Sequence, residues 1–253
     1  MRPFDLSLKG LLAQAAKVIG GIDGRVVRSV RALVAQPGSL TQAYVDGRRK
    51  PFVGPFQLFL LANLAFFAAQ SLSRTKIFSS TLDSHLHRQD WSELAQAMVA
   101  RRLAAAGTTL ERYAPVFDQA VVLNAKSLVI LMVLPLALLL PVIFWRSRRG
   151  FTVHGVFALH LNAFLLLLFC LALGISAFDA QTGGAGLQSA RVDNALTAMN
   201  LVACAVWAWL AAGRVYGGSG VVRALQSIVI AAAVLAIMLG YRFVIFAITL
   251  HTT

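Results

Sequence analysis

Five long apolar runs constrain the fold of this chain more than any other feature of its sequence. Each is long enough to cross a hydrocarbon core about 30 Å thick, because an α-helix rises about 1.5 Å per residue. Hydrophobic residues make up 58% of the 253 positions and charged residues only 13%, a balance outside that of soluble domains. The sequence therefore predicts an all-α integral membrane protein with five transmembrane helices. In the predicted membrane domain, 55–253, the spans are 55–72, 127–145, 151–178, 195–213 and 224–250, with an outer helical loop at 73–124.

The basic residues fall mainly on one side of the topology that these runs imply. Residues 1–54, 146–150 and 214–223 hold fourteen Lys and Arg against three acids, whereas the loops 73–124 and 179–194 hold seven of each. The positive-inside rule then places the N-terminus in the cytoplasm and the C-terminus outside, in a bacterial inner membrane. We interpret the net charge of +13 as contact with anionic lipid headgroups, and not with nucleic acid.

Residues 1–54 form the predicted cytoplasmic region and carry two amphipathic segments. In residues 6–19, leucines and valines fall on one helical face with lysines opposite, and the next segment sets valines against Arg25, Arg28 and Arg31. Short helices with basic polar faces are typical of the membrane interface. We therefore expect interfacial helices before the first span, with docking against other cytoplasmic protein as the alternative.

Polar groups inside hydrocarbon are costly unless they are paired, so they are the first candidates for a binding site. They are His154, His160 and Asn162 in the third span, and Arg242 in the fifth. For His160 we prefer a hydrogen bond to another helix, with a role as ligand or proton relay as the alternative. His154 begins the third span and lies near the headgroups. Arg242 either faces the bundle interior as a contact for an anion or headgroup, or extends to the outer surface beside Tyr241.

Patterns that would indicate catalysis or metal binding are weak. No Asp or Glu falls within the five apolar runs, which leaves a carboxylate-driven pump or a paired-carboxylate catalyst unsupported. Asp83, His85 and His87 have a D-x-H-x-H spacing, but without a further ligand nearby a solvated polar loop is the preferred interpretation. Cys170 and Cys204 lie inside spans and suit packing. We expect no catalytic residue, no metal and no cofactor.

Two further patterns concern helix packing. Pro135 and Pro141 predict a kink in the second span. Ala232, Ala236 and Gly240 recur every four residues in the fifth span, where small residues let another helix approach closely. We expect that helix to come from the same chain, with a second copy of the chain as the alternative.

A specific motif leads into the first span. The stretch Y-V-D-G-R-R-K-P-F-V-G-P-F runs from Tyr44 to Phe56 and follows Pro37-Gly38. It resembles the pattern P-G…Y-x-x-G-K/R-R…Y/F-x-x-P-F of a bacterial membrane family known as a domain of unknown function. The third-span stretch H-G-V-F-A-L-H, which begins at His154, also resembles that family, and so does the run at 215–217. The resemblance extends over most of residues 25–250.

The resemblance implies an inner-membrane protein with several spans and no assigned reaction. It also implies that Tyr44, Arg48, Arg49, His154 and His160 are the positions that matter. Many members of the family begin with a cysteine-rich zinc ribbon. No cysteine precedes position 170 here, which puts that module and any partner it recruits in doubt.

Two functions from different classes remain open. In the first, a non-catalytic scaffold or accessory protein docks a membrane protein partner, or a second copy, through its basic N-terminal region and outer loop. In the second, a transporter or lipid-binding protein uses His160, Asn162 and Arg242 as its site, while Arg48, Arg49 and Lys50 hold headgroups. The missing intramembrane carboxylates and the lack of an internal repeat favour the first function.

Overall fold

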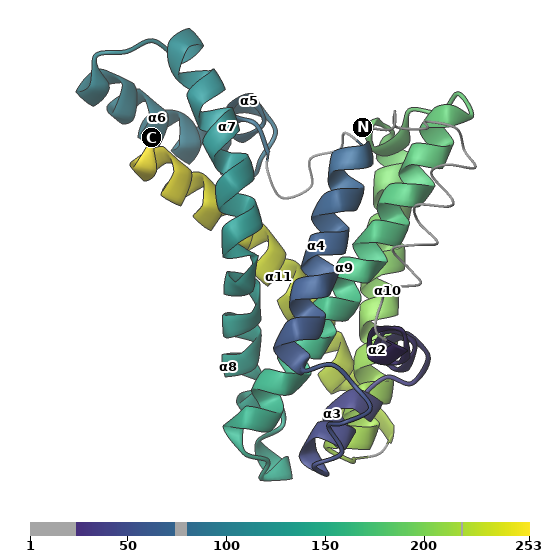
Figure 1. Ribbon diagram of the computed structural model, residues 1–253. Helices are drawn as coiled ribbons and strands as arrows, with labels where there is room; N and C mark the ends of the chain where they lie inside the picture. Colours follow the sequence, from purple (N-terminus) through teal and green to yellow (C-terminus); the bar gives the residue numbers. More distant parts are fainter. Residues whose placement is uncertain (1–23, 74–79, 219) are drawn as a thin grey trace, which may run out of the picture.

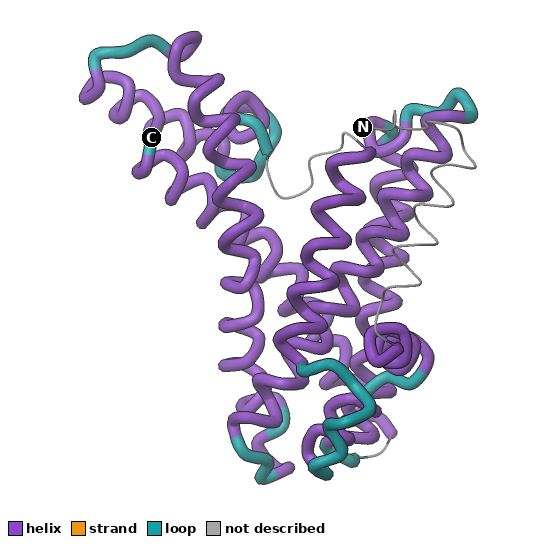
Figure 2. Tube along the Cα trace, in the orientation of Figure 1, coloured by secondary structure: helices purple, strands orange, loops and turns teal. Residues whose placement is uncertain are grey.

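The computed structural model describes residues 24–73, 80–218 and 220–253. In this part of the chain the regular elements are all helical (Figure 2). Five stretches are long and apolar enough to cross a membrane, which confirms an all-α membrane protein with five spanning helices. The predicted amphipathic helix at 6–19 lies outside the described residues. The α-helices are α2 (Gly24–Ala35), α3 (Ser39–Val45), α4 (Pro55–Ser73), α5 (Leu82–His87), α6 (Ser92–Ala106), α7 (Leu110–Leu128), α8 (Val133–Ile143), α9 (Phe151–Gln181), α10 (Ala190–Val215) and α11 (Gly220–Thr252), and the short 3₁₀ turns are η1 (Val129–Met132), η2 (Trp145–Ser147) and η3 (Gly186–Gln188).

The helices form two groups that meet at one end and separate at the other (Figure 1). Helix α4 packs along α9, with α10 beside them, while α7 and α8 form the second group. Helix α11 leans from α10 to α7 and so belongs to both groups. The end that carries α2 and α3 is named the basal end, and the end that carries α5 and α6 is named the cap end. Phenylalanines such as Phe66, Phe157 and Phe246 are fully buried between the helices.

Several spanning helices are longer than the apolar runs that predicted them. The second runs from Leu110 through η1 to Ile143, which is 34 residues. At about 1.5 Å per residue it exceeds a hydrocarbon core of about 30 Å by several turns. The helix ends therefore carry acids that the apolar runs lack. These acids are Glu111, Asp118, Asp179 and Asp193.

The second span changes from α-helix to a 3₁₀ turn at η1, just ahead of Pro135. A proline has no N–H to donate, and its ring crowds the carbonyl group four residues earlier. That carbonyl belongs to Leu131, which lies inside η1. The interruption that the prolines predict is thus this tightened turn.

The small-residue stripe on α11 faces outward. Ala232, Ala236 and Gly240 are all exposed in the described part of the chain. The expectation that a helix of the same chain covers them is therefore wrong. The physical reason is that α11 turns its larger residues, such as Ile230 and Val234, toward its neighbours, where both are buried.

The segment that carries α5 and α6 is named the cap. It packs onto α7 and α11 through an aromatic cluster around His85. The ring of His85 is buried, with its centroid 4.7 Å from that of Phe246 and 6.2 Å from that of Phe117. Trp91 donates its indole N–H to Nδ1 of His85 at 3.3 Å. In this arrangement His85 is a packing residue. Within the described residues no group of three or more His, Cys, Asp or Glu side chains is placed to hold a metal ion.

Docking of the cap is expected to weaken in acid. Burial, with a smaller contribution from the charge of Arg242, lowers the pKa of His85 from 6.5 to about 4. Between these two pH values the opened cap binds a proton that the docked cap does not. The free energy of opening of α5, measured by hydrogen exchange corrected for intrinsic rates, should therefore fall by up to about 1.4 kcal/mol per pH unit as the pH drops.

The matched control for this titration is His87. It is exposed and bonds to Asp83 of its own helix. A His87→Gln variant should keep the pH dependence, and a His85→Gln variant should lose it. An opening free energy in the unmodified protein that is flat from pH 6.5 to 4 would contradict the assignment.

Candidate functional site

Helices α2 and α3 fold back onto the basal ends of α9 and α10. Trp207 of α10 donates its indole N–H to the carbonyl of Leu33 at 2.8 Å, and Arg214 donates to the carbonyl of Pro37 at 3.0 Å. These bonds satisfy carbonyl groups at the end of α2, which would otherwise lack partners. Nδ1 of His160 lies 2.8 Å from the hydroxyl of Thr41, and both residues are buried. Helices α2 and α3, with the turn between them, are named the hairpin. The hairpin is thus fixed to α9 and α10 by polar contacts.

The turn between α2 and α3 requires a glycine. Gly38 has a φ of +82°, and a Cβ at this position would lie 2.8 Å from Cα and from the carbonyl oxygen of Ala211. Only a residue without a side chain allows so close an approach to α10. The P-G pair of the motif therefore places the hairpin against the fourth span.

The segment between α3 and α4 is held by α2. Arg25 donates to the carbonyl of Phe52 at 2.6 Å, and Arg28 donates to the carbonyl of Pro51 at 3.3 Å. The hydroxyl of Ser29 accepts the N–H of Val53 at 3.0 Å. A non-helical segment needs such partners for its backbone groups. The basic face of α2 therefore has a structural task as well as a positive charge.

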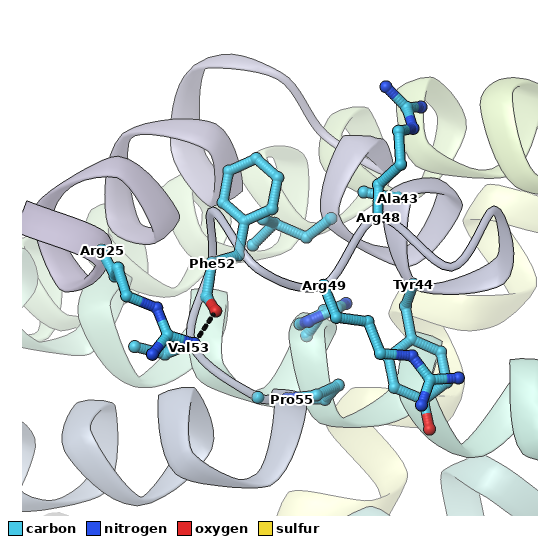
Figure 3. Close-up of a pocket in the computed structure, with 11 residues that line it drawn as sticks. Arg25, Ala43, Tyr44, Arg48, Arg49, Phe52, Val53 and Pro55 are labelled. Carbon is cyan, nitrogen blue, oxygen red and sulfur yellow. Dashed lines mark hydrogen bonds between the residues drawn. The ribbon is translucent and has the colours of Figure 1, made fainter.

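A pocket of about 170 Å³ opens between this segment, α2 and α3. We name it the arginine pocket. Figure 3 shows Arg25 and Arg49 on opposite sides of it, with Arg48 extending away. The guanidinium of Arg49 lies 4.1 Å from the ring centroid of Tyr44, a cation–π contact that holds it in place. The residues that line the pocket are Arg25, Leu40, Ala43, Tyr44, Arg48, Arg49, Phe52, Val53, Gly54, Pro55 and His160.

The charge around the arginine pocket is positive. Asp46 is the only carboxylate among residues 24–55, and it forms an ion pair with Arg48 at 2.8 Å. The hydrogen bond from Arg48 lowers the pKa of Asp46 below its usual value, so this carboxylate stays ionised and neutralises Arg48. Among the described residues, Arg49 forms no ion pair with a carboxylate, and Arg25 is bonded to the carbonyl of Phe52. The pocket therefore suits an anion.

The structure divides the predicted site residues between separate places. Tyr44, Arg48, Arg49 and His160 line the arginine pocket, whereas Lys50 is exposed and does not. The remaining three residues of the prediction lie elsewhere, so the predicted polar set does not form one site. Asn162 donates to the carbonyl of Ala158 in its own helix at 3.0 Å, Nδ1 of His154 lies 3.0 Å from the hydroxyl of Tyr216, and Arg242 lies toward the cap end.

The third-span motif braces the basal end. Phe157 lies between the motif histidines in sequence and is fully buried, with its ring centroid 5.6 Å from that of Trp207 and 5.4 Å from that of Tyr216. The stacked pair of His154 and Tyr216 lies beside it. His160 forms a hydrogen bond between helices, to Thr41, and it also lines the arginine pocket.

Helix α2 both docks on protein and keeps an apolar surface outside. Ser29, Ala32 and Leu33 are buried, while Val27 and Val34 are 54% and 51% exposed. These two valines are seven residues apart and so lie on one helical face. One face of α2 thus packs within the chain, and whether its exposed valines meet the membrane interface or another protein stays a prediction.

Seven of the eleven pocket residues were not among the predicted site residues, and Arg25 and Phe52 are two of them. Arg25 was assigned to a polar helix face, and Phe52 to the motif only. The signal that points to Arg25 is its spacing of four from Ser29, because residues four apart on a helix share a face. Both then reach the segment at 51–53.

The comparisons with known proteins reach only part of the chain. The family described as "Protein of unknown function (DUF3667)" matches residues 23–67. This range covers α2, α3, the segment at 46–54 and most of α4, and it includes every residue of the arginine pocket except His160. No curated protein and no solved structure matches the chain. The protein is thus a membrane protein with similarity, over residues 23–67, to a family of unknown function.

Proposed function

We propose that this protein binds the phosphate of an anionic lipid headgroup in the arginine pocket. The observation that carries the proposal is the guanidinium group of Arg49, which lines the pocket and is held over the ring of Tyr44, while the nearby Asp46 is already paired to Arg48. Guanidinium groups bind phosphate oxygens through charge-assisted hydrogen bonds. The role is binding, without catalysis, metal or cofactor.

Topology supports a lipid as the source of the phosphate. With the N-terminus in the cytoplasm of a bacterium, the basal end lies at the inner leaflet of the inner membrane, and the C-terminus lies outside. A cytoplasmic leaflet attracts basic residues through its anionic lipids. Arg28 and Arg31 lie between the outward valines in the sequence of α2 and are exposed like them, an arrangement that suits a helix lying in the interface. Nucleic acid is not part of the proposal.

The experiment measures binding of phosphatidylglycerol to the purified protein in nanodiscs or by native mass spectrometry. Arg49→Gln should weaken binding about tenfold, since a hydrogen bond to a charged group contributes about 1.5–3 kcal/mol. Arg31→Gln is the matched control, because Arg31 lies on α2, is exposed and does not line the pocket. Equal losses in the two variants would show a general surface charge instead of a site.

Soluble glycerol phosphate separates the two sources of phosphate. A lipid site should bind it much more weakly than the intact lipid, whereas comparable binding would indicate a free anion as the natural ligand. The scaffold function stays a prediction, supported by the exposed valines of α2. Recovery of one defined partner that is lost in a Val27→Ser and Val34→Ser double variant would favour it.

A further inference from the structure

The divergence of α10 and α11 toward the cap end leaves a groove between them (Figure 1). The groove has a volume of about 310 Å³, and α9 forms its floor. Its walls are largely apolar and include Leu165, Phe169, Leu201 and Val234. From Asp193 to Cys204 it follows twelve residues of α10, an axial rise of about 16 Å. That length reaches from the membrane surface to about the middle of a bilayer core of about 30 Å.

The cap-side mouth of this groove is polar. It joins a second cavity of about 820 Å³ beneath the cap, and Leu187, Asp193, Leu239 and Arg242 line both spaces. Arg242 donates to the hydroxyl of Ser80 at 3.0 Å. Its Nε is buried and has no hydrogen-bond partner among the described residues. An acceptor in this mouth would satisfy that donor.

The mouth holds both signs of charge. The carboxylates of Asp193 and Asp90 act electrostatically on Arg242, but within the described chain neither forms an ion pair with it. Both acids are exposed. A guanidinium and a carboxylate that face one cavity without pairing are complementary to a ligand with an anionic and a cationic group. The apolar groove below them is complementary to a hydrocarbon chain.

We infer that the groove binds a zwitterionic phospholipid of the phosphatidylethanolamine type, with its phosphate at Arg242, its ammonium group at Asp193 and one acyl chain between α10 and α11. Tyr241 does not share the surface role considered for it in the sequence. Its ring is buried, and its hydroxyl donates to the carbonyl of Ala125 at 2.7 Å. That bond anchors α11 to α7 beside the groove. The site is independent of the arginine pocket, which lies at the basal end.

The test is a competition between phosphatidylethanolamine and phosphatidylglycerol with identical acyl chains, read by native mass spectrometry of the full chain. The unmodified protein should prefer phosphatidylethanolamine. Arg242→Gln should weaken binding of both lipids at this site about tenfold, and Asp193→Asn should remove the preference. Arg191→Gln is the control, because Arg191 lies on α10, is exposed and lines neither cavity.

Two adjacent residues on α10 test whether an acyl chain occupies the groove. Leu201 lines the groove, whereas Val202 is 63% exposed. Leu201→Trp should displace the acyl chain and lower retention of the lipid, while Val202→Trp should not. The proposal is overturned if the two lipids bind equally to the unmodified protein, if Arg242→Gln behaves like Arg191→Gln, or if soluble glycerophosphoethanolamine binds as well as the lipid. Failure of Arg49→Gln alone would leave this site unaffected.

Discussion

Replacement of Gly38 by alanine is expected to destabilise the protein by about 2–5 kcal/mol. Its left-handed φ costs a residue with a Cβ about 1–2 kcal/mol. The new Cβ would also lie 2.8 Å from backbone atoms of Ala211, and overpacking of this kind costs about 1–3 kcal/mol. Because these contacts are with backbone, a side chain cannot rotate away to relieve them. Thermal unfolding of the purified protein measures the loss.

Gly47 provides a matched control for Gly38. Its φ of +75° is also left-handed, but a Cβ at this position would meet nothing within 4 Å. Gly47→Ala should therefore show only the conformational cost of about 1–2 kcal/mol. Similar losses in the two variants would mean that the close approach between the hairpin and α10 contributes nothing.

Replacement of Trp207 by alanine should cost about 3–5 kcal/mol, the usual range for a buried tryptophan. The side chain is only 2% exposed. Its ring stacks on Phe164 with centroids 5.4 Å apart, and its indole N–H is bonded to the carbonyl of Leu33. The variant would leave a cavity and a buried carbonyl without its donor. The same unfolding measurement tests this prediction.

Two further variants separate packing from the hydrogen bond. Trp207→Phe keeps much of the ring volume and loses the donor, so it should cost about 1–3 kcal/mol, the desolvation penalty of the unsatisfied carbonyl. Trp209 is the control, since it is 37% exposed and stacks only on Arg223 among the described rings and cations. A Trp209→Phe variant that is as unstable as Trp207→Ala would contradict the role given to Trp207.

The five spans were predictable because apolar runs of this length have no alternative to a membrane. The spanning helices nevertheless extend beyond the apolar runs that define the spans. Helix α7 carries Asp118 and Asn124, which a composition window treats as outside the membrane. In the structure Asp118 accepts the N–H of Leu82, and Asn124 donates to Thr249 at 2.9 Å. Because these polar residues have hydrogen-bond partners, α7 extends beyond the apolar run toward the cap end.

The candidate sites were predictable only in part. The motif indicated Tyr44, Arg48 and Arg49, because they are close in sequence. The spacing of four between Arg25 and Ser29 marks a shared helix face, but the segment that this face binds lies more than twenty residues further along the chain. Asp193 was missed for a different reason: the apolar run begins at residue 195, but α10 begins at Ala190.

The fold-back of the N-terminal hairpin also sets an order for biogenesis. The bond from Trp207 to Leu33 joins positions 174 residues apart, and that from Arg214 to Pro37 joins positions 177 apart. At about 5–20 residues per second, ribosomes need about 10–35 s to synthesise that interval. Until the third and fourth spans have been synthesised, α2 and α3 lack the contacts with α9 and α10 that fix them. The arginine pocket, which His160 of the third span completes, therefore forms only after that span has been made.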